Sequence, residues 1–434
     1  MTKHWKPLVA LAAIAWAAAA PAQAETLTLA SPDGKITVTV SDDGGQATYA
    51  VAFEGKQAIA PSKLGMLFAE HHGFERGLAI AGQTRASKDT TWEQPWGERR
   101  LVRDQHNELA VTFRTETDGP ARDITVRFRA FDTGIGFRYE LAEQPALQGD
   151  IAIVEELTQF AVGDKTTMWY TPSDEFNRNE NIYRIAPAGE VDDAHTPSTF
   201  RTPDGIHMAI HEAALIDYSS MSLDQLRPGN FQANLRNWAG GPKVKTKAPF
   251  KSPWRTIQVA RDAVGLINSD IILNLNEPNA LGDVSYAKPG KYIGIWWAMH
   301  INDRTWASDR YHGATTEETK RYIDFAAKHG FSGVLVEGWN KGWDGDWFNN
   351  GDLFSFTEPY PDYDIEALSK YAAAKGVQII VHHETSANLT NYEKQLEAGL
   401  DLVRKIGSNY VKSGYVSDAG DAVWVDDKGI RHYE

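Results

Sequence analysis

Apolar positions follow two different patterns along the chain. Up to about residue 285, apolar and polar residues alternate in short runs, as in 123–131, where every second side chain is apolar from Ile124 to Ala130. This period of two is typical of strands with one buried face. No helical pattern intervenes, so the sequence predicts an antiparallel β-sandwich over 25–285. Its other strands are expected at 35–41, 47–53, 108–114 and 134–141.

Beyond Pro289 the pattern changes to apolar strands that alternate with amphipathic helices. A continuous apolar run at 291–300 predicts a strand, and a helix is expected at 315–330. Thr315 and Glu318 have the spacing of a capping box, and Gly330 ends the helix. Further elements are predicted as strand 332–337, helix 365–375, strand 377–384, helix 391–406 and strand 409–416. Such cycling indicates parallel βα units.

Four predicted parallel strands fit either an open doubly wound sheet or part of a (β/α)8 barrel. No glycine-rich phosphate loop follows any strand, which disfavours a nucleotide-binding sheet. Polar and aromatic residues follow the strands where barrel active sites are built. The predicted fold is therefore multidomain, β plus α/β, with a sandwich followed over 286–434 by the first half of a (β/α)8 barrel. A whole barrel takes about 250 residues, so its later strands are expected outside this sequence.

The N-terminus has the pattern of a secretory signal peptide over 1–24. Lys3 and Lys6 precede an apolar stretch, and Ala22-Gln23-Ala24 offers a small-x-small cleavage pattern after Ala24. This apolar stretch is too short to span a membrane, and no longer apolar run occurs elsewhere. The chain has no cysteine, so disulfides are excluded. We expect a periplasmic or secreted protein without a membrane span.

The net charge excludes two classes of partner. At −14, the chain lacks the basic balance that nucleic acids and anionic membranes require. A neutral ligand or a cation fits better. We expect a monomer.

Two glutamates follow apolar strands and are the first candidates for chemistry. Glu337 ends the run at 332–337, and Glu384 ends the run at 377–384. The ends of adjacent parallel strands meet at one mouth, where carboxylates polarise water or bind hydroxyl groups. Paired carboxylates are the usual machinery of glycoside hydrolysis.

Tryptophans point to the substrate class. Six of the 14 fall between residues 296 and 347, and an indole face suits the apolar side of a sugar ring. The strand-end position of Trp296 favours sugar binding. Trp306 and Trp347 are instead expected to pack the core and loops.

Three further polar residues lie near the strand ends. His382 shares a face with Glu384 and is the expected ligand contact, whereas the adjacent His383 points to the other side and is expected to be structural. Lys412 is placed to bind a hydroxyl or a carboxylate. A metal-dependent hydrolase of amides or phosphodiesters would use His382 and the acids, but it leaves the tryptophans unexplained.

Several segments resemble glycoside hydrolase family 97, namely "GKYIGIWW", "RYIDFAAKHGFSGVLVEGWNKGW", "YPDYDIEALSKYAAAKGVQIIVHHETS" and "YVKSGYV". The resemblance implies a secreted, calcium-dependent α-glycosidase with a sandwich, a (β/α)8 barrel and a further β-domain. It implies an inverting exo-α-glucosidase, because the aspartate nucleophile of the retaining α-galactosidase branch is replaced by Gly414. The retaining α-galactosidase and a non-catalytic glycan-binding protein remain alternatives.

The same resemblance assigns roles to single residues. Glu384 matches the general base, whereas the general acid is expected beyond this sequence. Substrate-binding roles fall on Trp296, Glu337, His382 and Lys412. One calcium ligand is expected from the sandwich, where Glu180 in "NENIY" is the best match and Glu212 is the rival.

Overall fold

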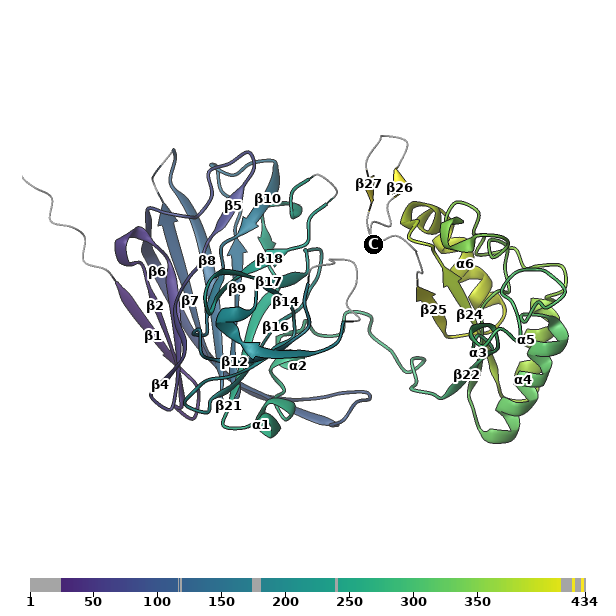
Figure 1. Cartoon of the computed structure of the whole chain (residues 1–434). Coiled ribbons are helices and arrows are strands. Elements are labelled where there is room, and N and C mark those ends of the chain that lie inside the picture. Colours follow the sequence, from purple (N-terminus) through teal and green to yellow (C-terminus); the bar gives the residue numbers. More distant parts are fainter. Residues whose placement is uncertain are drawn as a thin grey trace, which may run out of the picture.

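The computed structural model describes residues 25–115, 117, 119–173, 181–238, 241–414, 424–425 and 431–432 (Figure 1). The predicted signal peptide at 1–24 and the candidate calcium ligand Glu180 lie outside the described residues. Among the helices that are described, none has both the length and the apolar character needed to cross a membrane.

The N-terminal part contains two large antiparallel sheets. In spatial order, the first comprises β1 (Thr26–Ala30), β2 (Ile36–Ser41), β3 (Thr48–Phe53), β4 (Lys56–Lys63), β11 (Gln159–Ala161), β18 (Asn230–Leu235), β17 (Met221–Arg227) and β14 (Asp193–His195). The second comprises β13 (Arg184–Pro187), β12 (Thr167–Tyr170), β15 (Ser198–Arg201), β16 (His207–Ala213), β21 (Trp254–Ala260), β9 (Gly134–Leu141), β8 (Arg122–Phe131), β7 (Leu101–Thr115) and β6 (Leu78–Glu93), with β20 (Phe250–Lys251) beside β9.

A small sheet and two short helices complete this part. The small sheet has the order β19 (Val244–Lys247), β10 (Asp150–Glu156) and β5 (Met66–Phe68). Helices α1 (Ala263–Ile267) and α2 (Ile271–Leu275) follow β21 and precede the connection to the second part.

A common apolar core explains why the two large sheets lie face to face. In β8, side chains alternate between buried and half-buried from Ile124 onward, as the period of two predicts. Residues of both sheets, such as Val38 and Phe128, join one buried cluster. The antiparallel sheets therefore fit the predicted β-sandwich, and Figure 1 labels many of their strands.

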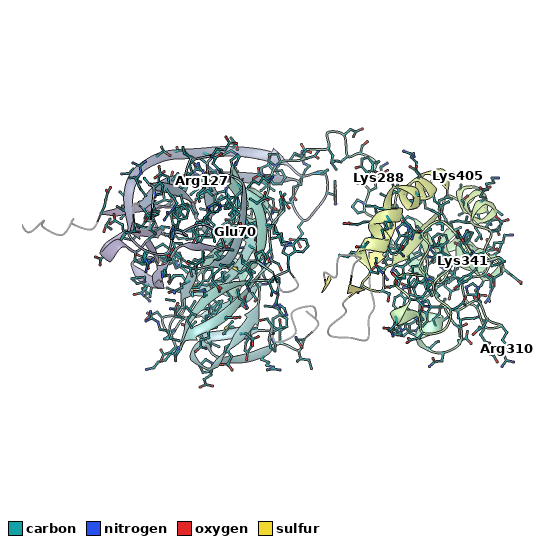
Figure 2. The ribbon with its side chains drawn as sticks, turned by 90° about the horizontal axis from the view of Figure 1, so that it is seen from above. Glu70, Arg127, Lys288, Arg310, Lys341 and Lys405 are labelled. Carbon is teal, nitrogen blue, oxygen red and sulfur yellow. The ribbon has the colours of Figure 1, made fainter. Side chains whose placement is uncertain are left out.

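The C-terminal part is built around a parallel sheet with the order β22 (Tyr292–Gly294), β23 (Gly333–Val336), β24 (Gln378–Glu384) and β25 (Val411–Gly414). The helices are α3 (Trp297–His300), α4 (Thr316–His329), α5 (Ile365–Ala373) and α6 (Leu389–Lys405). A short hairpin of β26 (Trp424–Val425) and β27 (Arg431–His432) follows. Exposed Arg310, Lys341 and Lys405 mark this part in Figure 2.

The predicted βα alternation is confirmed, together with the boundary signals of α4. The Thr315 hydroxyl accepts a hydrogen bond from the Glu318 amide at 3.2 Å, and Gly330 ends the helix in the left-handed conformation. Because β22–β25 form an open sheet among the described residues, the closed (β/α)8 barrel stays a prediction.

The predicted strand at 291–300 is wrong beyond its first residues. The strand ends at Gly294, and Trp296 already has helical backbone angles, so the run continues as α3. A continuous apolar run does not distinguish a buried strand from a buried helix. The Trp296 indole folds back over Gly294, where a β-carbon would lie 2.4 Å from its Nε1.

Candidate active site

The carboxyl ends of the parallel strands surround one cavity of about 530 Å³. Parallel pairing sets this geometry, because Glu384 at the end of β24 lies in register with Gly414 at the end of β25. The structure thereby brings together the sequence-predicted residues of this part. The cavity is lined by Trp296, Glu337, His382, Glu384 and Lys412, together with Met299, His300, Asn302, Trp306, Trp343, Trp347, Phe348 and Gly414.

Glu337 is held by a cation and an indole. Its Oε1 lies 2.9 Å from Lys412 Nζ, and its Oε2 accepts a hydrogen bond from Trp306 Nε1 at 3.2 Å. The carboxylate is buried, whereas the lysine side chain is 43% exposed. Lys412 thus provides charge at the rim while the glutamate lies within the wall.

Glu384 is anchored by the strained turn that follows it. Its Oε1 accepts a hydrogen bond from the Ser386 amide at 2.8 Å, and its side chain is almost fully buried. Ser386 and Ala387 both have positive φ angles, of 46° and 58°. Non-glycine residues in this region cost about 1–3 kcal/mol each and cluster at functional sites. The turn therefore fixes a carboxylate that already ends a buried strand.

His382 lies between the two glutamates. Its Nδ1 is 3.7 Å from Glu337 Oε1, and its Nε2 is 3.9 Å from Glu384 Oε2. Burial lowers the pKa of His382 to about 4, against the opposing attraction of Glu337, so the ring is neutral near neutral pH. Within the described residues, its buried Nδ1 has no hydrogen-bond partner.

His383 has the structural position that its place in the strand predicts. It points away from the cavity and lies beneath α6, where its Nδ1 is 3.2 Å from the Tyr392 hydroxyl. Phe356 packs edge-on against the ring. Burial lowers the pKa of His383 to about 4.

Aromatic side chains form much of the cavity wall. Trp306 and Trp343 stack at 11° with ring centroids 6.3 Å apart, and Trp347 contacts both. Lys412 Nζ lies 5.8 Å from the centre of the Trp296 ring. Trp306 and Trp347 pack against apolar clusters, as predicted, and both also line the cavity. Trp343 and His300 were not predicted as site residues, because Trp343 lies in a loop and His300 ends the short helix α3, where no periodic signal marks them.

Glu212, the rival calcium candidate, forms an ion pair with Arg255. Its Oε2 pairs with Arg255 at 2.5 Å, and its Oε1 accepts from the Met221 amide at 3.1 Å. With an arginine against it, this carboxylate does not fit a cation site in the present arrangement. Within the described ranges, no group of three or more His, Cys, Asp or Glu side chains is placed to hold a metal ion.

A sandwich followed by βα units, with two carboxylates in an aromatic-walled mouth, is typical of enzymes that act on glycosides. The chain belongs to glycoside hydrolase family 97. The description "Glycosyl-hydrolase 97 N-terminal" matches residues 29–278, and "Glycoside hydrolase 97" matches residues 296–434.

Solved and curated relatives agree with this family. A family 97 enzyme from Pseudoalteromonas sp. strain K8, solved as a variant with panose and also with acarbose, is 52% identical with a TM-score of 0.90. The match covers 94% of this chain and 62% of that enzyme. The "Retaining alpha-galactosidase" of Bacteroides thetaiotaomicron is 25% identical over 82% of this chain and 55% of its own length. The chain thus spans little more than half the length of these relatives.

A more distant neighbour shares the fold alone. A beta-arabinopyranosidase superposes with a TM-score of 0.73 at 20% identity and covers 89% of this chain.

Proposed function

We propose that the whole protein is a secreted, inverting exo-α-glucosidase that acts on α-linked glucooligosaccharides. The observation that carries this proposal is the shared cavity, in which Glu337 and Glu384 end adjacent strands among tryptophans. Family membership supports a glycosidase. The remaining strands of a (β/α)8 barrel, and the general acid, are expected from sequence outside this chain.

The glucose preference is supported by the relatives. The enzyme that is 52% identical was solved with panose and acarbose, which are built from α-linked glucose or glucose-like rings. The galactosidase is only 25% identical, and its name favours a retaining α-galactosidase as the second candidate. The higher identity favours the glucoside.

The inverting assignment depends on Gly414. By resemblance, a retaining enzyme of this family would place a nucleophilic aspartate at the end of this strand. Here the position has no side chain, and a β-carbon added to Gly414 would lie 3.3 Å from His382 Nε2. With no carboxylate at 414, the chain supplies Glu384 as a base and leaves attack on the anomeric carbon to water.

The proposed mechanism uses the anchored carboxylate of Glu384. It removes a proton from a water molecule while the water oxygen bonds to the anomeric carbon. The glycosidic bond breaks, and the leaving oxygen takes a proton from the general acid. The Ser386 amide fixes Glu384 during this step. A preorganised base of this kind contributes about 10²–10⁴-fold to the rate.

The neighbouring residues are proposed to bind the sugar. Glu337 accepts hydrogen bonds from hydroxyl groups, and Lys412 donates one at the rim. His382, neutral because burial lowers its pKa to about 4, contributes to a hydroxyl group its Nδ1, which has no hydrogen-bond partner in the part of the chain that the structure describes. Trp296 offers an indole face to the ring.

Calcium remains part of the proposal through Glu180, which lies outside the described residues. Hard oxygen ligands suit this ion. Because Glu212 already pairs with Arg255, we propose Glu180 as the sandwich ligand. Glu180→Ala should weaken calcium binding in titration calorimetry of the whole protein, whereas Glu212→Gln should leave the calcium affinity unchanged.

Hydrolysis by the purified whole protein tests the function. We expect release of glucose from panose and much slower cleavage of p-nitrophenyl α-galactoside. Preferred cleavage of the galactoside would favour the second candidate. Binding of panose without hydrolysis would indicate a glycan-binding protein instead.

A further inference from the structure

His312, which lies behind the cavity wall, connects both ends of the loop that follows Glu337. It belongs to the segment between α3 and α4, and its side chain is buried. Its Nε2 lies 2.9 Å from the Gly338 carbonyl oxygen, where the loop begins. Its Nδ1 lies 2.8 Å from Asp362 Oδ2, just before α5, where the same loop ends. Between these points the loop carries Trp343 and Trp347.

The two oxygen atoms that contact the ring nitrogens of His312, from Asp362 and Gly338, are both hydrogen-bond acceptors. A neutral imidazole has one N–H group, so it satisfies only one of two acceptors, whereas an imidazolium donates to both. The other charged groups that face the ring are also carboxylates, Asp309 from the same segment and Asp344 from the loop. Tyr360 packs edge-on at 5.5 Å. The His312 ring therefore lies among hydrogen-bond acceptors, carboxylates and one aromatic side chain.

The contact of His312 with Gly338 holds the backbone next to Glu337. Gly338 follows Glu337 in the chain; its φ of 81° favours glycine, and a β-carbon there would lie tightly, 3.0 Å from the Trp306 carbonyl oxygen. Trp306 in turn donates to the Glu337 carboxylate. A β-bridge between Thr305 and His312 joins the ends of the segment that carries Trp306 and His312. This segment therefore contacts both the Glu337 side chain, through Trp306, and the backbone of Gly338, through His312.

We propose that His312, in contact with Asp362 and with the Gly338 carbonyl, is a positioning residue that fixes Glu337 and the tryptophan loop for sugar binding, while Trp306 of the same segment holds the Glu337 carboxylate. The inference deepens the proposed function, since it assumes that Glu337 binds the substrate.

Histidine NMR of the whole protein tests the contact with Asp362 without any activity assay. With ¹⁵N-labelled histidine, the ring signals of His312 are identified by their loss in His312→Gln. We expect Asp362→Asn to shift the Nδ1 signal of His312, because the group that contacts this nitrogen changes. An Nδ1 signal that is unchanged in Asp362→Asn would overturn the proposal.

Kinetics separate positioning from a purely structural role. KM does not depend on the fraction of folded enzyme, whereas the apparent kcat does. We expect His312→Gln and Trp306→Phe each to raise KM by about tenfold, the loss typical of a charge-assisted hydrogen bond. His329→Gln, at an exposed histidine of α4, should leave KM unchanged. Unchanged KM in both variants would contradict the proposal, and a different sugar specificity would leave the NMR result intact.

Discussion

The sandwich and the parallel sheet both bury glutamates, but the partners of these glutamates differ. In the sandwich, fully buried Arg255 donates to Glu156 at 2.8 and 2.7 Å and to Glu212 at 2.5 Å. In the parallel sheet, His382 lies 3.7 Å from Glu337 and 3.9 Å from Glu384, and it is neutral near neutral pH.

This difference distinguishes a structural group from a binding group. The donors of Arg255 are directed at two carboxylates. These ion pairs link β21 and β16 of the second large sheet to β10 of the small sheet. The glutamates of the parallel sheet face a cavity, and the nearest cation, Lys412, is partly exposed at its rim. Such a site retains hydrogen-bonding capacity for a ligand.

The largest expected effect is on catalysis. Glu384→Gln preserves shape but removes the base, so kcat should fall by about 10²–10⁴-fold while KM changes little. Steady-state kinetics on panose measure both values. Glu366→Gln, at an exposed glutamate of α5 that pairs with Lys405, is the matched control and should behave like the unmodified protein. A near-normal kcat in Glu384→Gln would remove this residue from the mechanism.

The second effect is on the stability of the sandwich. Arg255→Met leaves two buried carboxylates without their cation, which typically costs about 3–5 kcal/mol. Denaturant unfolding should show this loss. The exposed pair of Arg114 and Asp123 provides the contrast, since Arg114→Met should cost at most about 1 kcal/mol. Equal losses in the two variants would show that burial does not distinguish these networks.

The third effect is a pH dependence of the free energy of unfolding, and it arises from His382 in the parallel sheet. Because burial lowers the pKa of His382 to about 4, the unfolded chain takes up a proton before the folded one does. Stability should therefore decrease as the pH falls from about 6.5 to about 4, by roughly 3 kcal/mol for this residue. His382→Asn should reduce that slope in denaturant unfolding at several pH values. An unchanged slope would mean that folding does not lower the pKa of His382.

Much of the fold was predictable because its signals are local. Alternation identified β8, and capping residues such as Thr315 and Gly330 marked the ends of α4. The single mouth for Glu337 and Glu384 follows from the rule that parallel strands end at one edge.

Other features depend on contacts that the sequence does not encode locally. The apolar run after Gly294 turns into α3, since apolarity alone does not set the backbone conformation. Trp306 reaches Glu337, and His312 reaches Gly338, only because two long loops fold against each other. Loop residues have no periodicity, so neither contact carried a signal.

The stereochemistry of the first product tests the central claim most directly. In an inverting enzyme, water attacks the anomeric carbon once, so the configuration changes. A proton NMR time course of an α-glucoside with the whole protein should show β-glucose first, with the α-anomer appearing later through mutarotation. Release of α-glucose first would show a retaining reaction, and it would contradict the roles of Glu384 and Gly414 proposed here.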